Sequence, residues 1–197
     1  MGVPLKLLIQ MTGNRNGTPH DFVLRGNYVF DDPATVQPGA EDADKKLQGF
    51  FLADANGDGY YNIVIEDNLI NASNTSNSLI VAGASHNVVI RNNTLLPTAV
   101  GSGGGIRVTE FAGGTHQGII VSKNVADTPR YGTAPSVQSI DNIFYNIRNE
   151  PIPLNTLFED ASAFGTWRNF NPKSGRPIDF GSGYGAERRV KQLQAER

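Results

Sequence analysis

The segment Asn62-Ile-Val-Ile-Glu-Asp-Asn68-Leu-Ile70 shares its pattern with a later segment, Asn87-Val-Val-Ile-Arg-Asn-Asn93-Thr-Leu95. In each, two apolar residues flank a central residue. After them come two polar residues, an Asn and a second short apolar stretch. Three more segments fit this pattern, and the residues that align are Asn27, Asn68, Asn93, Asn124 and Asn142. Their separations of 41, 25, 31 and 18 residues predict one repeating unit with loops of unequal length at fixed corners.

A second apolar segment precedes each of the first four units, at residues 6–11, 49–53, 78–82 and 105–109. Each is rich in Leu, Ile, Val or Phe, and a turn rich in Gly or Asn follows it. We therefore predict a unit of strand, turn, strand, Asn corner and variable loop. Because one unit cannot bury its own apolar face, each strand should pair in parallel with its equivalent in the next unit.

The register of the unit predicts the environment of particular side chains. The inward positions should form one apolar column that includes Val23, Val64, Val89 and Ile120. The Asn at the corner should adopt the left-handed backbone conformation and hydrogen-bond to the next Asn along the axis. This structural ladder would contain Asn27, Asn68, Asn93, Asn124 and Asn142.

The two quoted segments resemble the repeats of right-handed parallel β-helices, the fold of pectate-lyase-like enzymes, mannuronan epimerases and phage tailspikes. The resemblance covers roughly residues 5–150. It implies an all-β protein in which residues 1–150 form a right-handed parallel β-helix of about five coils. Residues 151–185, with aromatic side chains among Gly and Pro, are predicted to form an irregular C-terminal cap over the open end. Residues 186–197 are predicted as a short charged tail that favours helix.

The composition excludes several classes of function. The chain has 197 residues, 39% hydrophobic and 18% charged, which suits one domain with a buried core. Its 17 basic and 19 acidic residues indicate no nucleic-acid partner, and no apolar run is long enough for a membrane span. The absence of Cys excludes disulfides and thiolate metal sites. The N-terminal sequence contains no recognisable signal peptide, since its apolar stretch at 7–9 is short and adjoins Lys6.

One polar loop resembles half of a calcium site. Asp54-Ala-Asn56-Gly57-Asp58-Gly59 places oxygen ligands at alternate positions and a Gly at the sixth, as a hard cation requires. The twelfth position, which should be a bidentate Glu, is Ile65, and Glu66 follows one residue later. Asp54, Asn56 and Asp58 are therefore candidate ligands of Ca²⁺, and the alternative is a polar turn between two strands. No other cofactor is indicated.

Charged side chains recur at one position of the unit. Arg25, Glu66 and Arg91 occupy it in the first three units and should form a ladder of alternating charge on the outer face. The structural interpretation is cross-strand pairing, worth a few tenths of a kcal/mol per pair. The functional interpretation is a charged groove for an acidic sugar, formed by Arg25, Glu66 and Arg91 together with Arg107.

The candidate catalytic residues are His20, Glu66, Glu110 and His116. Thr18-Pro19-His20-Asp21 resembles the Asp-Pro-His-Asp motif of mannuronan C5-epimerases, but its first residue is Thr. Glu110 and His116 flank the turn at 113–114 and could supply acid–base chemistry. The alternative for His20 is a repeated turn residue, because His86 occupies the same position in the third unit. Nothing in the sequence shows that Glu110 and His116 converge.

Two classes of function follow from the resemblance. We expect a structural or adhesive component of a phage or phage-like virion, such as a spike, fibre or decoration protein, that contacts host surface polysaccharide. Five coils span only ~24 Å, a short platform for a long polysaccharide groove. The expected partners are further copies of the chain, as in the trimeric tailspikes, or other virion proteins. The expected location is the virion or the extracellular space.

The alternative is a carbohydrate-active enzyme, a lyase, C5-epimerase or hydrolase acting on acidic polysaccharide. The full motifs of such enzymes are missing from the sequence, which argues against catalysis. A third interpretation is a purely structural β-helix that presents loops, of which the acidic segment 31–47 is the longest.

Overall fold

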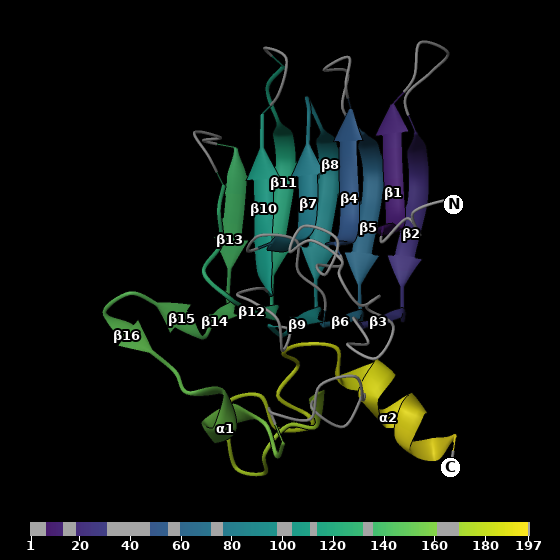
Figure 1. Ribbon diagram of the computed structural model, residues 1–197. Helices are drawn as coiled ribbons and strands as arrows, with labels where there is room; N and C mark the ends of the chain where they lie inside the picture. The colour runs from purple at the N-terminus through teal and green to yellow at the C-terminus, as the bar shows by residue number, and fades with distance from the viewer. Residues whose placement is uncertain are drawn as a thin grey trace, which may run out of the picture.

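Three parallel sheets form most of the structure (Figure 1). The computed structural model describes residues 7–13, 19–30, 48–54, 60–71, 77–97, 104–110, 114–131, 136–160 and 170–196. Each sheet takes one strand from each successive repeat, and every strand pairs in parallel with its equivalent in the neighbouring repeat. The described chain is therefore mostly β, with parallel sheets.

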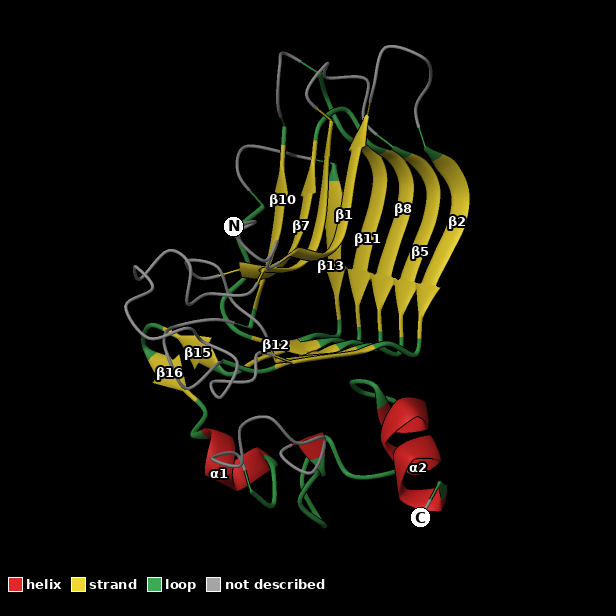
Figure 2. Cartoon of the chain, turned by 45° about the vertical axis from the view of Figure 1, so that its right-hand side comes forward, coloured by secondary structure: helices red, strands yellow, loops and turns green. Residues whose placement is uncertain are grey.

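The first two sheets face each other (Figures 1 and 2). The first contains, in spatial order, β1 (Leu7–Gly13), β4 (Gln48–Asp54), β7 (Asn77–Ala82) and β10 (Gly105–Thr109). The second contains β2 (His20–Arg25), β5 (Tyr61–Glu66), β8 (His86–Arg91), β11 (Gln117–Ser122) and β13 (Val137–Ile140). These strands correspond to the two predicted in each repeat.

The third sheet was not expected, because the sequence predicts two strands in each repeat and the structure has three. Its strands are β3 (Tyr28–Phe30), β6 (Leu69–Asn71), β9 (Thr94–Leu95), β12 (Val125–Ala126) and β14 (Ile143–Phe144). Each begins directly after a ladder Asn. Two or three residues are too few to show an alternating pattern, so the sequence suggested only a corner.

Side chains from the three sheets meet in one apolar core. Phe50 and Leu52 of β4, Ile63 and Ile65 of β5, and Ile70 of β6 are fully buried there. The core fills the space between the sheets, because alternate residues of each strand point inward.

The predicted inward column is wrong by one residue. Val23 is 50% exposed, and Val64, Val89 and Ile120 are only partly buried. Their neighbours, such as Val88 and Ile90, have no exposed surface. Each of these strands carries three apolar residues in a row, so either set of alternate positions fits the pattern, and a shift of one residue exchanges the two faces.

The C-terminal part covers the third sheet (Figure 2). It contains the antiparallel pair β15 (Asn146–Ile147) and β16 (Glu150–Pro151), and the helices α1 (Leu154–Leu157) and α2 (Glu187–Ala195). Leu69 and Val125 pack there in a second apolar cluster with Phe158, Phe170 and Val190.

Part of this segment packs against the outer face of the third sheet through Phe158, Phe170 and Val190. The reason is that Leu69 and Ile70 are both apolar and point to opposite faces, so the outer face also needs burial. Within the described ranges, no helix has the length and apolar character that crossing a membrane requires.

Candidate functional site

The ladder asparagines are hydrogen-bonded in series along the corner between the second and third sheets. The Oδ1 atom of Asn68 accepts bonds from both the backbone N–H and the Nδ2 of Asn27, each at 2.9 Å. The same pair of hydrogen bonds joins Asn68 to Asn93, Asn93 to Asn124 and Asn124 to Asn142, with distances of 2.8–3.1 Å. Each Nδ2 from Asn68 onward also donates to a backbone carbonyl of the preceding repeat.

The left-handed backbone belongs to the residue before each ladder Asn, not to the Asn itself as the sequence analysis predicts. We call these five residues the corner row: Gly26, Asp67, Asn92, Lys123 and Asp141, with φ between 49° and 67°. The ladder Asn instead uses its amide to link neighbouring repeats. The corner row needs residues that tolerate positive φ, and Gly, Asn and Asp fill four of its five positions.

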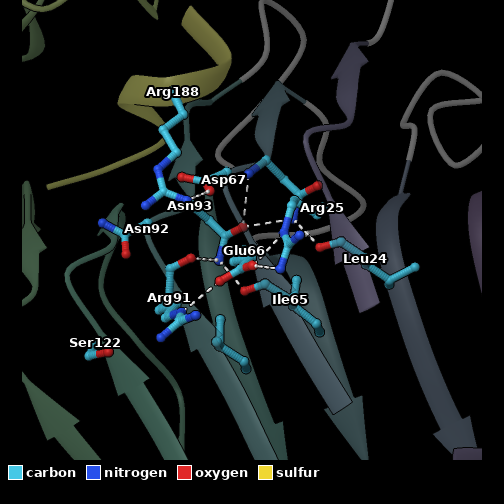
Figure 3. A network of polar contacts seen from close by, with 12 residues as sticks. Leu24, Arg25, Ile65, Glu66, Asp67, Arg91, Asn92, Asn93, Ser122 and Arg188 are labelled. Atoms are coloured by element: carbon cyan, nitrogen blue, oxygen red, sulfur yellow. Dashed lines mark hydrogen bonds and ion pairs between the residues drawn. The ribbon is translucent and has the colours of Figure 1, made fainter. Parts of the chain in front are cut away.

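The charged ladder also forms at this corner (Figure 3). Glu66 is 3% exposed and lies between two arginines of neighbouring strands. Arg25 Nε donates to Glu66 Oε1 at 2.5 Å, and Arg91 Nε donates to Glu66 Oε2 at 2.6 Å. Burial raises the pKa of Glu66, but the hydrogen bonds and charges of Arg91 and Arg25 outweigh it and leave the pKa below its usual value. Glu66 is therefore an ionised structural partner and a poor proton donor at neutral pH.

A segment of the C-terminal part crosses the corner row. We call residues 181–188 the strap. The Nδ2 of Asn92 donates to the carbonyl of Gly183 at 2.6 Å, and the N–H of Gly185 donates to the carbonyl of Lys123 at 2.8 Å. Arg188 extends to Asp67, with 3.7 Å between Nη1 and Oδ2 (Figure 3). The strap is therefore held to three consecutive repeats.

A cleft of about 420 Å³ lies between the strap and the corner. The sheet side of the cleft is formed by Glu66, Asp67, Arg91, Asn92 and Lys123. The strap side is formed by its glycines, Glu187 and Arg188. Most of the lining is therefore charged or polar, and three of its residues carry positive charge.

Besides Glu66, two further carboxyl groups of the cleft have shifted pKa values. Burial raises the pKa of Asp67, and the charge of Glu66 adds to the rise against the opposing charge of Arg188. Burial also raises the pKa of Glu187, but hydrogen bonds from Lys191 and from the backbone of Gly181 and Gly183 reverse the shift. The carboxylate of Glu187 is thus satisfied within the C-terminal segment itself.

Positive and negative residues are equal in number along the lining of the cleft. Lys123 Nζ lies 5.7 Å from the ring centroid of Tyr184, a cation–π distance. Across the part of the chain that the structure describes, no ion pair joins Lys123 to a carboxylate. The local carboxylates are Glu66, Asp67 and Glu187. The cations of the lining are Arg91, Lys123 and Arg188, while Arg25 and Lys191 lie outside it as partners of Glu66 and Glu187.

Arg107 lies elsewhere. It is an exposed residue of β10 in the first sheet, whereas Arg25 and Arg91 end strands of the second sheet. The structure therefore brings together Arg25, Glu66 and Arg91 but leaves Arg107 outside the group.

The two candidate histidines lie in different surroundings. His20 is exposed at the start of β2, with Nδ1 at 2.7 Å from Asp21 Oδ2 and its ring stacked on Tyr61 at 4.5 Å. His116 is 2% exposed, and its Nδ1 accepts the N–H of Ser85 at 3.2 Å. Burial lowers the pKa of His116, and the charge of Glu110 opposes the shift only in part. His116 is thus a buried neutral residue that fixes a turn.

The candidate calcium ligands Asn56 and Asp58 lie outside the described residues, as do the side chain of Asp54 and the loop 31–47. Among the residues that are described, no group of three or more His, Cys, Asp or Glu side chains could hold a metal ion.

The sequence alone does not group Asp67, Lys123 and Arg188 in one site. A signal was present for two of them, since Asp67 and Lys123 each precede a ladder Asn and therefore share a row. Arg188 had no such signal, because its contact with Asp67 depends on how the C-terminal part folds back.

No family model matches this chain, and neither a curated protein nor a solved structure matches it.

Proposed function

We propose that the chain is a right-handed parallel β-helix of about five coils that serves as a structural, adhesive component of a phage or phage-like virion. As a spike, fibre or decoration protein it would contact acidic polysaccharide on the host surface. The repeated passage through three parallel sheets supports the fold. The asparagine ladder supports it as well, because the same corner recurs in every repeat.

The unpaired edge strands of the second sheet support a role in assembly. Within the described residues, β2 and β13 each pair on one side only in the second sheet. Phe22 and Leu24 of β2 remain partly exposed, whereas their equivalents in β5, Ile63 and Ile65, are fully buried. Unpaired edges beside an incompletely covered core favour association with another polypeptide. A second copy, a trimer or another virion protein would satisfy them.

The adhesive part of the proposal is supported by the arginines of the charged ladder. The side chains of Arg25 and Arg91 are 59% and 51% exposed, although each is bonded to Glu66. Their remaining N–H groups can donate to carboxylates of an acidic glycan. Because Glu66 holds them in place, little side-chain freedom is lost on binding.

The test combines mass and binding. Light scattering should give the mass of an oligomer, and the protein should be retained on immobilised alginate or polygalacturonate without releasing unsaturated uronate. A monomer that is retained on neither polysaccharide would contradict the proposal. A monomer that releases unsaturated product would replace it with the enzyme.

The second candidate is the carbohydrate-active enzyme, and the surroundings of Asp67 support it. A carboxyl group with a raised pKa in a polar cleft beside arginines suits a proton donor to a sugar. If the chain is a lyase, epimerase or hydrolase that uses this group, Asp67→Asn abolishes product release without changing the melting temperature by more than a few degrees. Full activity of Asp67→Asn would remove Asp67 from the chemistry.

A further inference from the structure

We propose that the cleft between the strap and the corner row binds the carboxylate of a single uronic acid residue. The inference rests on the proposed function, since uronic acids are units of acidic polysaccharides. It adds a defined place on the molecule, which differs from the open outer face of the sheets.

Lys123 is the residue of the cleft that favours an anion. The three carboxylates of the cleft already have cationic partners. Glu66 pairs with Arg25 and Arg91. Asp67 pairs with Arg188, and Glu187 pairs with Lys191. Lys123 has no carboxylate partner in the described chain, and Arg91 and Arg188 remain largely exposed at 51% and 81%. Lys123 is exposed at the cleft, where an unpaired positive charge attracts anions.

The glycines of the strap leave access to Lys123. A Cβ atom added to Gly183 would lie 3.9 Å from Lys123 Nζ, so any side chain longer than Ala would compete for the space in front of the amine. Gly183 has a φ of +78° and Gly181 a φ of +92°, values that also disfavour other residues. The backbone of the strap thus approaches the corner row closely without covering the amine.

The size and polarity of the cleft suit a sugar ring. Its volume of about 420 Å³ lies in the range of pockets for small molecules, ~300–1,000 Å³. The amide of Asn92 and the carboxyl of Asp67 line the sheet side beside the cations and can bond to hydroxyl groups. A carboxylate on a polyhydroxylated ring therefore matches both the charge and the polar lining.

The test is titration calorimetry of the full chain at low ionic strength with sodium glucuronate. Glucose, inorganic phosphate and sulfate serve as the neutral and the simple anionic comparisons. The variants are Lys123→Asn, which keeps a residue type that tolerates positive φ, and Arg188→Gln. Arg148→Gln, an exposed residue between β15 and β16, removes the same charge away from the cleft.

We expect glucuronate to bind with one site per chain and glucose not to bind. Each cleft variant should weaken binding at least about tenfold, the effect of losing one charge-assisted hydrogen bond, and Arg148→Gln should not. If both cleft variants bind glucuronate as tightly as wild type does, the assignment is overturned. Binding of phosphate or sulfate without glucuronate would also overturn it. Thermal melts of both variants confirm that they are folded.

The outcome separates this inference from the proposed function. In one outcome, wild type binds glucuronate and the cleft variants do not, but wild type is a monomer that is not retained on immobilised polysaccharide. The cleft assignment then holds and the virion proposal fails. In the other outcome, wild type is an oligomer that is retained on immobilised polysaccharide but does not bind glucuronate. The cleft assignment then fails and the virion proposal holds.

Discussion

The Oδ1 atom of Asn93 accepts two hydrogen bonds from Asn68, one from its backbone N–H at 3.1 Å and one from its Nδ2 at 2.8 Å. Both residues have no exposed surface. One side-chain oxygen therefore satisfies two buried donors of the neighbouring repeat, and the arrangement recurs along the corner. Such a group is costly to remove, because water cannot replace it.

The first prediction concerns this oxygen. Asn93→Ala leaves the backbone N–H of Asn68 without its acceptor and leaves the Nδ2 of Asn68 with the carbonyl of Leu24 alone. It should lower the free energy of unfolding by about 3 kcal/mol. Chemical denaturation measures the change. Asn155→Ala, on an exposed position of α1, is the control and should cost less than ~0.5 kcal/mol. Equal effects of the two substitutions would show that the ladder contributes nothing special.

The second prediction tests the register of β8. Val88→Thr puts a hydroxyl into the core and should cost ~1–3 kcal/mol. Val89→Thr is the matched control, because the same exchange one residue later meets a half-buried outer position. Its cost should be under ~1 kcal/mol. The reverse order of the two melting temperatures would restore the inward column that the sequence suggested.

The third prediction concerns pH. The pKa of Glu66 is lowered in the fold, so its contribution to stability is present above its ordinary value of 4.5 and is lost as pH falls through the lower value of the fold. Glu66→Gln should therefore be less stable than wild type at pH 7, and the difference should shrink below about pH 4.5. Denaturation at several pH values checks this. A difference that stays constant down to pH 2 would remove the ion pairs from the explanation.

The fourth prediction concerns the strap. Gly185→Ala places a Cβ 2.4 Å from Thr94 Oγ1, at a backbone with φ +64°. It should release the strap, and hydrogen exchange of α2 should rise. Gly175→Ala is the control, since its φ of +72° carries the same backbone strain but its Cβ meets nothing within 4 Å. If both variants exchange alike, backbone strain rather than the clash with Thr94 determines the effect.

Much of the fold was predictable because the recurring Asn aligned the repeats. The strands 61–66 and 86–91 of the second sheet follow directly from that alignment. The inward face did not follow, since Ile63, Val64 and Ile65 are all apolar and only the packing of the three sheets determines which of them is buried.

The candidate site was predictable in part. Arg25, Glu66 and Arg91 were expected to be neighbours because they occupy one position of the repeat, and the register places them in adjacent strands. The cleft depends instead on the strap, which comes from outside the repeats. No periodicity connects Arg188 to Asp67, so only the folded chain shows that they meet.

The ladder gives the molecule a polarity. Every step runs in the same sense, from the amide nitrogen of one repeat to the amide oxygen of the next. Asn27 therefore begins a chain of aligned amide dipoles that Asn142 ends, and the two ends offer different hydrogen-bonding groups. A neighbour that continues the ladder at one end must present donors, and at the other end acceptors, so growth of an assembly along this axis would be directional.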